Sequence, residues 1–569
     1  MRRRPRPIVL LFRTLTLGVL LCASGLGVAG CKEKDTPEAW IQRLTAPGKR
    51  AAAVKRLIQL VQEESSTAEA GTSSAANAER AAILEALTKA YVDAALDETT
   101  RIELIKFLAD TRDTRTRAAW IKACSGFAEG KGQSEEDVKW AAGAMAATKL
   151  EDGVAALGQA FLKLQAGSLQ GARASKNVHD AMVSLASPSW KDLILDRLSR
   201  RLIRPSGAGD ATAVAGYQNE LFWQTTAVDL AGELRDVTTV KPLFKVVMAP
   251  SKSDLAPAAV LALTRIGKDA MPVLLGALAG KDPELVEYAR SNSGGSPDDT
   301  KSCVRAAALV LGAIGRADAT DPMLQALEAA DSDATRAVIA RELTRLPAEP
   351  RVVNAFQAAY DKIDQTTVAP PLGQNARSRL LESAANFFDP SMISWLLKEM
   401  NDRKGDRNKV AVNTAGLMSV IKLMTKAQIA VVKSAVAKYG SRAEEDAFEV
   451  ARDVVNACAD DVECYVSRLI VPAAEEQDTR FIGVKAAYML GIFGRADTSM
   501  QIVKQLSMVK SAVIRASAAL AIDHLTRSDP APIAEALQRI VDQSKGKEKR
   551  NIVDPDAPLV EAIYRLRVR

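Results

Sequence analysis

Residues 307–318 read Ala-Ala-Leu-Val-Leu-Gly-Ala-Ile-Gly-Arg-Ala-Asp, and residues 486–497 repeat the phrase as Ala-Ala-Tyr-Met-Leu-Gly-Ile-Phe-Gly-Arg-Ala-Asp. Weaker copies occupy residues 227–236, 259–267 and 514–522. Aligned on the Leu-Gly position, neighbouring copies are 32, 48 and 30 residues apart, with anchors at Ala231, Leu263, Leu311, Leu490 and Leu520. Such spacing indicates repeated pairs of helices joined by loops of variable length.

The phrase resembles a HEAT repeat, in which an alanine-rich first helix ends at Leu-Gly and a Gly-Asp turn reverses the chain. Alanines at helical spacing let neighbouring helices approach closely, leucines and isoleucines fill the space between layers, and glycine suits a left-handed helix end. The resemblance is strong over 225–345 and 480–545 and moderate near 37–60 and 100–125; elsewhere it rests on hydrophobic periodicity alone. It implies an all-α, HEAT-like α-solenoid of stacked antiparallel helix pairs.

Composition agrees with a helical repeat. A chain of 569 residues is too long for one compact core, and aromatic residues make up only 5% of it, so an all-β fold is disfavoured. Five sites place a capping oxygen directly before a proline, which predicts helix starts. These sites are Thr36-Pro37, Asp282-Pro283, Asp321-Pro322, Asp389-Pro390 and Asp529-Pro530.

Three stretches interrupt the repeat pattern. Residues 64–79 and 291–300 have the low complexity of insertions between helices, whereas residues 365–375 carry two prolines and a glycine and are predicted to form an irregular linker. The linker would separate an N-terminal part of the solenoid, residues 37–364, from a C-terminal part, residues 376–569.

The N-terminus has the features of an export signal. Residues 1–30 contain five arginines and no acidic residue, and an apolar run leads to Val28-Ala29-Gly30-Cys31. This arrangement resembles a bacterial lipoprotein signal peptide with its lipobox. Cys22 fits less well, because bulky Leu20 and Leu21 precede it. The alternative is an uncleaved membrane anchor over residues 8–30, which is long enough at about 20 apolar residues but contains an arginine.

The resemblance implies that residues 1–30 are removed, that Cys31 carries the lipid, and that residues 31–36 form a tether. Several acyl chains would hold the protein on a membrane more firmly than one. Lys32 follows the cysteine where, by resemblance to the enterobacterial sorting rule, an aspartate would retain the protein at the inner membrane. We therefore expect a lipid-anchored protein on the periplasmic face of the outer membrane.

The net charge argues against a nucleic-acid partner. The whole chain has a formal charge of +7, but residues 31–569 hold 71 basic and 69 acidic side chains, a difference of only +2. Residues 31–569 contain no long run of charges of one sign. A body this close to neutral lacks the basic face that attracts phosphate backbones.

Cys458 and Cys464 are predicted to form a disulfide, because an exported protein lies in an oxidising compartment. Along one continuous helix their α-carbons would be about 9 Å apart, which is too far, so a turn is required. Asp460 and Asp461 suit a helix break at that point. The alternative is two buried free thiols, which is also what we expect of Cys124 and Cys303.

Candidate catalytic and metal-binding residues are few. His179 and His524 are the chain's two histidines. His179 precedes Asp180, but no nucleophile motif accompanies the pair, so a solvated helix face is expected. His524 is expected to pack within a repeat helix or to lie at the surface. We therefore predict no catalytic residue, no metal site and no cofactor.

These observations favour a protein-binding or scaffold module of the bacterial cell envelope that has no catalytic activity. Its expected partners are other envelope proteins and the membrane, with no nucleic acid and no small-molecule substrate. Long concave surfaces are typical binding surfaces of such repeat proteins. Two alternatives remain: an enzyme of the HEAT-like bilin-lyase kind, and a structural or assembly factor for envelope polymers.

Overall fold

The computed structural model describes residues 35–66, 74–207, 209–292, 301–369, 373–401, 407–470, 476–544 and 556–569. The predicted signal peptide, residues 1–30, lies outside the described residues, as do Cys31, Lys32 and all but the last two residues of the tether. Residues 67–73 of the first predicted insertion (64–79) and residues 293–300 of the second (291–300) also lie outside them.

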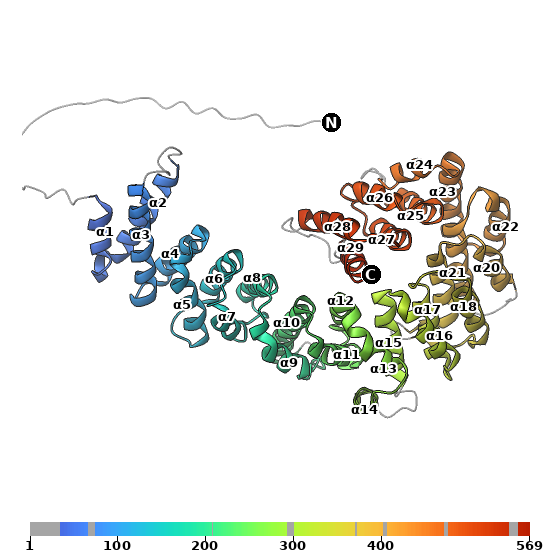
Figure 1. Ribbon diagram of the computed structural model, residues 1–569, viewed down its shortest axis with the longest axis horizontal. Coiled ribbons are helices and arrows are strands. Elements are labelled where there is room, and N and C mark those ends of the chain that lie inside the picture. The colour runs from blue at the N-terminus through green and yellow to red at the C-terminus, as the bar shows by residue number, and fades with distance from the viewer. Residues whose placement is uncertain are drawn as a thin grey trace, which may run out of the picture. The chain divides into compact units, whose positions relative to one another are not determined.

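The described residues are helical nearly throughout, which confirms the predicted all-α class (Figure 1). The chain divides into two compact units between Thr100 and Arg101. The first unit contains α1 (Pro37–Arg43), α2 (Arg50–Ser66), α3 (Ser74–Asp93) and the start of α4 (Glu98–Thr111).

The second unit contains the remaining helices. These are α5 (Arg117–Ala128), α6 (Glu135–Thr148), α7 (Val154–Phe161), α8 (Leu169–Leu185), α9 (Lys191–Ser199), α10 (Ala211–Leu234), α11 (Val240–Met248), α12 (Ala256–Ile266), α13 (Met271–Leu278), α14 (Pro283–Asn292), α15 (Lys301–Ile314), α16 (Thr320–Glu328), α17 (Asp333–Leu343), α18 (Pro350–Lys362), α19 (Ala376–Ser383), α20 (Met392–Asn401), α21 (Arg407–Leu423), α22 (Ile429–Tyr439), α23 (Arg442–Cys458), α24 (Val462–Ser467), α25 (Glu476–Phe493), α26 (Thr498–Leu506), α27 (Ala512–Leu525), α28 (Ala531–Ser544) and α29 (Ala557–Arg567).

Residues 365–375, predicted as an irregular linker, lie inside the second unit. They include the short strands β1 (Val368–Ala369) and β2 (Gln374–Asn375). The two strands pair antiparallel, with Val368 opposite Asn375. Asn375 also caps α19, because its side-chain oxygen accepts a hydrogen bond from the Ser378 amide at 3.0 Å.

The copies of the repeated phrase lie in two groups of packed helices. They lie in α10, α12, α15, α25 and α27, and α10 packs on α12, α12 on α15, and α25 on α27. Four anchors, Ala231, Leu263, Leu311 and Leu490, are fully buried. The small or branched apolar residue at this position of each copy therefore lies at the contact between neighbouring helices of the group.

The Asp/Thr-Pro pattern places the starts of α1 and α14 correctly and misses the other three by one or two residues. α20 begins at Met392, two residues after Pro390, and α28 begins at Ala531, one residue after Pro530. Thr36 caps α1, and the Asp282 side chain accepts from the Leu285 amide at 3.2 Å before α14. The prediction at Asp321-Pro322 is wrong by two residues, since a 3₁₀ turn over Ala317–Ala319 runs directly into α16 at Thr320. Proline is tolerated there because amides in the first helical turn need no partner within the helix.

The last helix returns to the middle of the second unit. In Figure 1, α29 lies beside α12 and α15, and packing contacts join it to those helices as well as to α27 and α28. Two glycines make room for it: a Cβ at Gly315 would overlap the Arg565 guanidinium, and one at Gly267 would overlap Val568. Both have positive φ, +70° and +68°. The helices from α12 to α29 thus form a closed circuit.

Candidate functional site

A cavity of about 1020 Å³ lies where α29 closes this circuit. Its walls come from the turn after α15, the turn after α17, the residues around Phe388, and the helices α27 and α29. Five arginines line the cavity: Arg316, Arg345, Arg527, Arg565 and Arg569. Three acidic residues accompany them, Asp318, Asp523 and Glu561.

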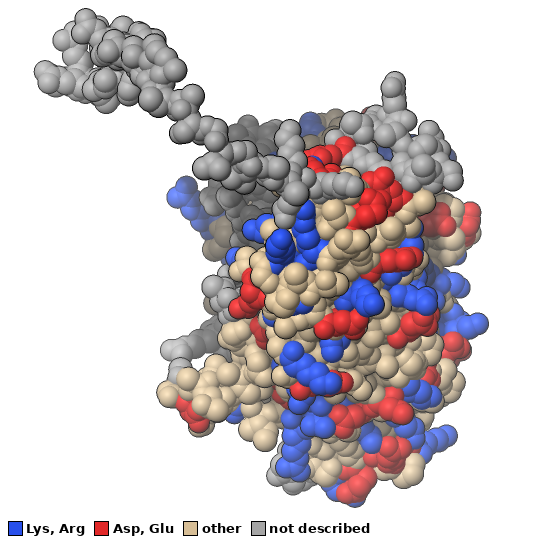
Figure 2. Space-filling view, turned by 90° about the vertical axis from the view of Figure 1, so that its left-hand side faces the viewer, with Lys and Arg blue, Asp and Glu red and all other residues tan. Residues whose placement is uncertain are grey.

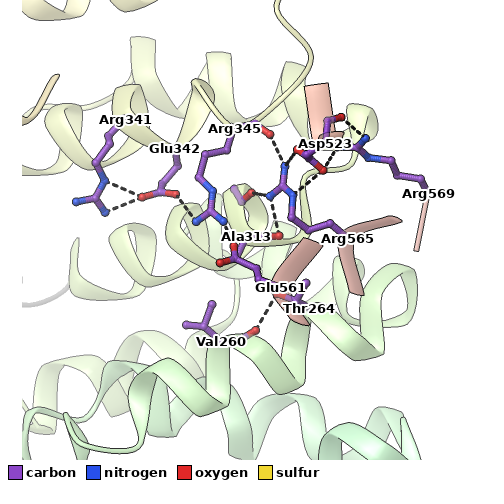
Figure 3. A network of polar contacts seen from close by, with 11 residues as sticks. Val260, Thr264, Ala313, Arg341, Glu342, Arg345, Asp523, Glu561, Arg565 and Arg569 are labelled. Carbon is purple, nitrogen blue, oxygen red and sulfur yellow. Dashed lines mark hydrogen bonds and ion pairs between the residues drawn. The ribbon is translucent and has the colours of Figure 1, made fainter. Parts of the chain in front are cut away.

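Arg565 is the centre of the polar network that Figure 3 shows. Its guanidinium donates to the carbonyls of Gly312 at 2.6 Å, Ala313 at 2.8 Å and Arg345 at 2.7 Å. The first two carbonyls belong to the last turn of α15, where no later amide of the helix donates to them and a positive charge is favourable. Arg565 therefore joins the C-terminal helix to an element more than 250 residues earlier.

Each acidic residue of the cavity is held by an arginine. Asp523 accepts from Arg565 at 2.8 Å and from Arg569 at 2.6 Å. Burial alone would raise the pKa of Asp523, but these two guanidiniums outweigh it and hold that pKa below its ordinary value. Glu561 pairs with Arg345, and Asp318 pairs with Arg316 at 2.8 Å.

An aromatic wall faces the arginines. The Phe388 ring lies 4.7 Å from the His524 ring and 5.3 Å from the Tyr488 ring, measured between centroids. Phe388 has φ +52°, a left-handed conformation that is strained for a bulky residue. Gly491 of the repeated phrase makes room for the ring, because a Cβ there would overlap Phe388.

His524 is uncharged near neutral pH. Burial lowers its pKa to about 4, and the nearby Arg527 and Arg569 act in the same direction, against the opposing effect of Asp523. The imidazole therefore offers one donor and one acceptor to the cavity.

Arg527 differs from the other four arginines. It is exposed at the cavity mouth, in the loop that follows α27. With the residues that the structure describes, its guanidinium makes no hydrogen bond and no ion pair.

The structure brings the predicted cysteine pair together. Cys458 ends α23, α24 begins at Val462, and the two cysteine α-carbons are 5.4 Å apart with the sulfurs at disulfide distance. Asp461 caps the second helix, accepting from the amides of Glu463 at 2.9 Å and Cys464 at 3.2 Å. The predicted turn is therefore present. Cys124 and Cys303 are buried and free.

The histidines lie apart from each other. His179 does not pair with its neighbour Asp180, which binds Lys176 instead. The His179 Nε2 lies 3.4 Å from Asp229 of α10, and its Nδ1 lies 3.0 Å from the Thr226 hydroxyl. The solvated face predicted for His179 is therefore wrong: its imidazole is partly buried against the next helix pair. His524, for which packing or surface was predicted, lines the cavity.

Sequence reasoning missed the cavity residues. Arg565, Phe388 and Arg527 carried no motif, and the available signals were indirect. One is the Gly-Arg-Ala-Asp turn at 315–318, which holds Arg316; the other is the row of arginines at 565, 567 and 569. In isolation both are typical of a solvated surface.

The arrangement suits binding. It combines four engaged guanidiniums, and that of Arg527 without a described partner, with an aromatic and aliphatic wall in a cavity of ligand size. In the part of the chain that the structure describes, no group of three or more His, Cys, Asp or Glu side chains is placed to hold a metal ion. None of the described helices is long and apolar enough to cross a bilayer.

Outside the cavity, charges are mixed. On the face that Figure 2 shows, lysines and arginines lie among aspartates and glutamates, with uncharged residues between them. No family model matches the chain, and a comparison with curated proteins found no related sequence.

Proposed function

We propose that this chain is a lipid-anchored, HEAT-like solenoid that acts as a binding or scaffold module in the bacterial cell envelope. The observation that carries the binding role is the cavity of about 1020 Å³ between α15, α17, α27 and α29. Its walls come from segments up to about 250 residues apart, and a network of buried ion pairs fixes them. A site held in this way is preorganised to bind a partner.

Two features support the envelope location. The residues Val28-Ala29-Gly30-Cys31 after an apolar run are similar to a lipoprotein cleavage site. The Cys458–Cys464 pair is at disulfide distance, and disulfides persist in oxidising compartments. The anchor would hold the binding cavity close to a membrane surface.

The binding role is tested by photo-crosslinking in cells. A photoreactive amino acid replaces Ala557, an exposed residue that lines the cavity on α29. The matched control carries it at Val513, which is 52% exposed on α27 and lies outside the cavity lining. We expect discrete protein adducts from position 557 and none of the same mass from position 513. Equal labelling from both positions, or none from 557, would contradict the proposal.

The anchor is tested separately. Mass spectrometry of the mature N-terminal peptide should show a lipid on Cys31, and Cys31→Ser should release the protein from the membrane fraction. A Cys31→Ser protein that stays in that fraction would rule out the lipid anchor while leaving the crosslinking result interpretable.

A further inference from the structure

The five arginines of the cavity exceed its three acidic residues by two. Asp318, Asp523 and Glu561 are each engaged by an arginine of the cavity. Arg527 has no such partner among the described residues. What the cavity still offers a ligand is therefore a positive charge with several N–H donors, not a negative one.

Part of the cavity lining is apolar. Ala516, Ala519 and Leu520 of α27 face the cavity, and Pro558 and Ala562 of α29 line it opposite them. A ligand that fills this space needs apolar groups as well as an anion. An isolated inorganic ion would leave most of the cavity unfilled, since the volume is near the upper end of the range for ligand sites.

A contact within the chain shows which kind of group pairs with the arginines of the cavity. Glu561 is presented by the turn of a helix, its carboxylate binds Arg345, and the adjacent Ala562 is buried on the same wall. A carboxylate carried on a peptide, with small apolar side chains beside it, thus already occupies one part of this cavity. Arg527 offers a second position of the same kind.

We propose that the cavity binds a segment of a partner protein that carries a carboxylate, and that this carboxylate pairs with Arg527. The proposal rests on the proposed binding function and names the chemistry of its partner. The apolar neighbours of the carboxylate pack on α27 and α29. The neutral His524 and the Asn386 amide, which also line the cavity, are positioned to hydrogen-bond to the peptide backbone.

The test uses the full-length chain purified in detergent and short peptides of alanine, leucine and serine that carry an uncharged fluorophore. One peptide contains a single glutamate and an amidated C-terminus, the second replaces the glutamate with glutamine, and the third combines that glutamine with a free C-terminal carboxylate. Fluorescence anisotropy gives the dissociation constants. The second peptide has neither a glutamate nor a free C-terminus. We expect it to bind on the order of fivefold more weakly than whichever of the first and third peptides binds more tightly. The first and third peptides distinguish a side-chain from a terminal carboxylate.

Arg527→Gln should abolish the difference between these peptides, whereas Arg539→Gln, at an exposed position of α28 outside the cavity lining, should preserve it. Arg527 is exposed and has no described partner, so its replacement leaves the fold intact. Equal binding of all three peptides, no peptide binding, or a preference that survives Arg527→Gln would overturn this inference. So would displacement of the peptide by inorganic phosphate more strongly than by acetate, which would indicate a phosphate ligand. In each case adducts from position 557 would still support the broader binding function.

Discussion

At the scale of single residues, the cavity residue His524 makes the stability of the fold depend on pH. Its folded-state pKa of about 4 is lower than the ordinary 6.5, because burial and the cations Arg527 and Arg569 disfavour imidazolium. Between pH 6.5 and about 4 the unfolded chain binds a proton at this position that the folded chain does not. Folding stability therefore falls as the pH drops through this window, and this contribution changes no further below about pH 4.

His524→Gln should remove that part of the pH dependence. The shift corresponds to about 3 kcal/mol as an upper limit, and about 2 kcal/mol is a better expectation because the ring is partly exposed. Chemical denaturation of both proteins across the window measures the effect, and the comparison cancels the titration of other groups. The explanation fails if the two stability profiles run parallel from neutral pH to about pH 4.

At the scale of elements, the turn after α15 is shaped for α29. Gly315 has φ +70°, and a Cβ there would overlap Arg565. Gly280 has a similar φ of +65°, yet nothing lies within 4 Å of the position its Cβ would take. Gly280→Ala should therefore cost only the backbone strain, about 1–2 kcal/mol. Gly315→Ala should cost about 2 kcal/mol more, since the Arg565 network must shift as well.

Thermal or chemical unfolding of the two alanine variants measures this difference. Because the backbone strain is matched, a larger loss at Gly315 reports the contact with α29. Equal losses at the two positions would mean that α29 does not pack against this turn in solution.

The disulfide is a second prediction at this scale. Its loop is short, so replacing both Cys458 and Cys464 by alanine should lower stability by on the order of 2 kcal/mol. The effect should stay within α23 and α24, because the bridge joins only those two helices. Non-reducing peptide mapping checks the bond itself; thiol labelling at both positions in protein taken from the envelope would exclude it.

Local patterns explain which elements could be predicted. The Leu-Gly phrase, the Thr36 cap and the turn at Asp461 all depend on residues within a few positions of one another. The helices and the cysteine pair were therefore within reach of sequence reasoning. The start of α16 was not, since a preceding 3₁₀ turn extended the helix past the expected cap.

The cavity could not be predicted for a different reason. Arg565 finds its partners at Gly312, Ala313 and Arg345, more than 200 residues away. Nothing in the local sequence of α29 indicates which carbonyls it meets. Phe388 is a similar case, because its ring fits against Gly491, and from the sequence alone that glycine only continues a repeat.

At the scale of the whole molecule, the contact of α29 with α12 and α15 changes which helices a mutation destabilises. In a linear array of repeats each unit contacts only its neighbours, so damage to the last helix stays near that end. In the second unit α29 packs on α12 and α15 as well as on α27. A mutation that loosens α29 should therefore also destabilise residues 256–314, which are far from it in sequence.

Arg565→Ala tests this expectation, with Arg567→Ala as the matched control on the same helix. Arg565 is 4% exposed and holds Asp523 and three carbonyls, so its loss leaves buried polar groups without partners and should cost about 3 kcal/mol. Arg567 is exposed and donates to Gln538 at 3.2 Å, so its loss should cost less than about 0.5 kcal/mol.

Hydrogen exchange followed by mass spectrometry shows where the stability is lost. In Arg565→Ala the amides of α12 and α15 should exchange faster, because the helix that covers them is held less firmly. The amides of α6, which packs mainly on α5 and α8, should keep their protection. Faster exchange confined to α27–α29 would show instead that the second unit behaves as an open array, and that the cavity is not closed in solution.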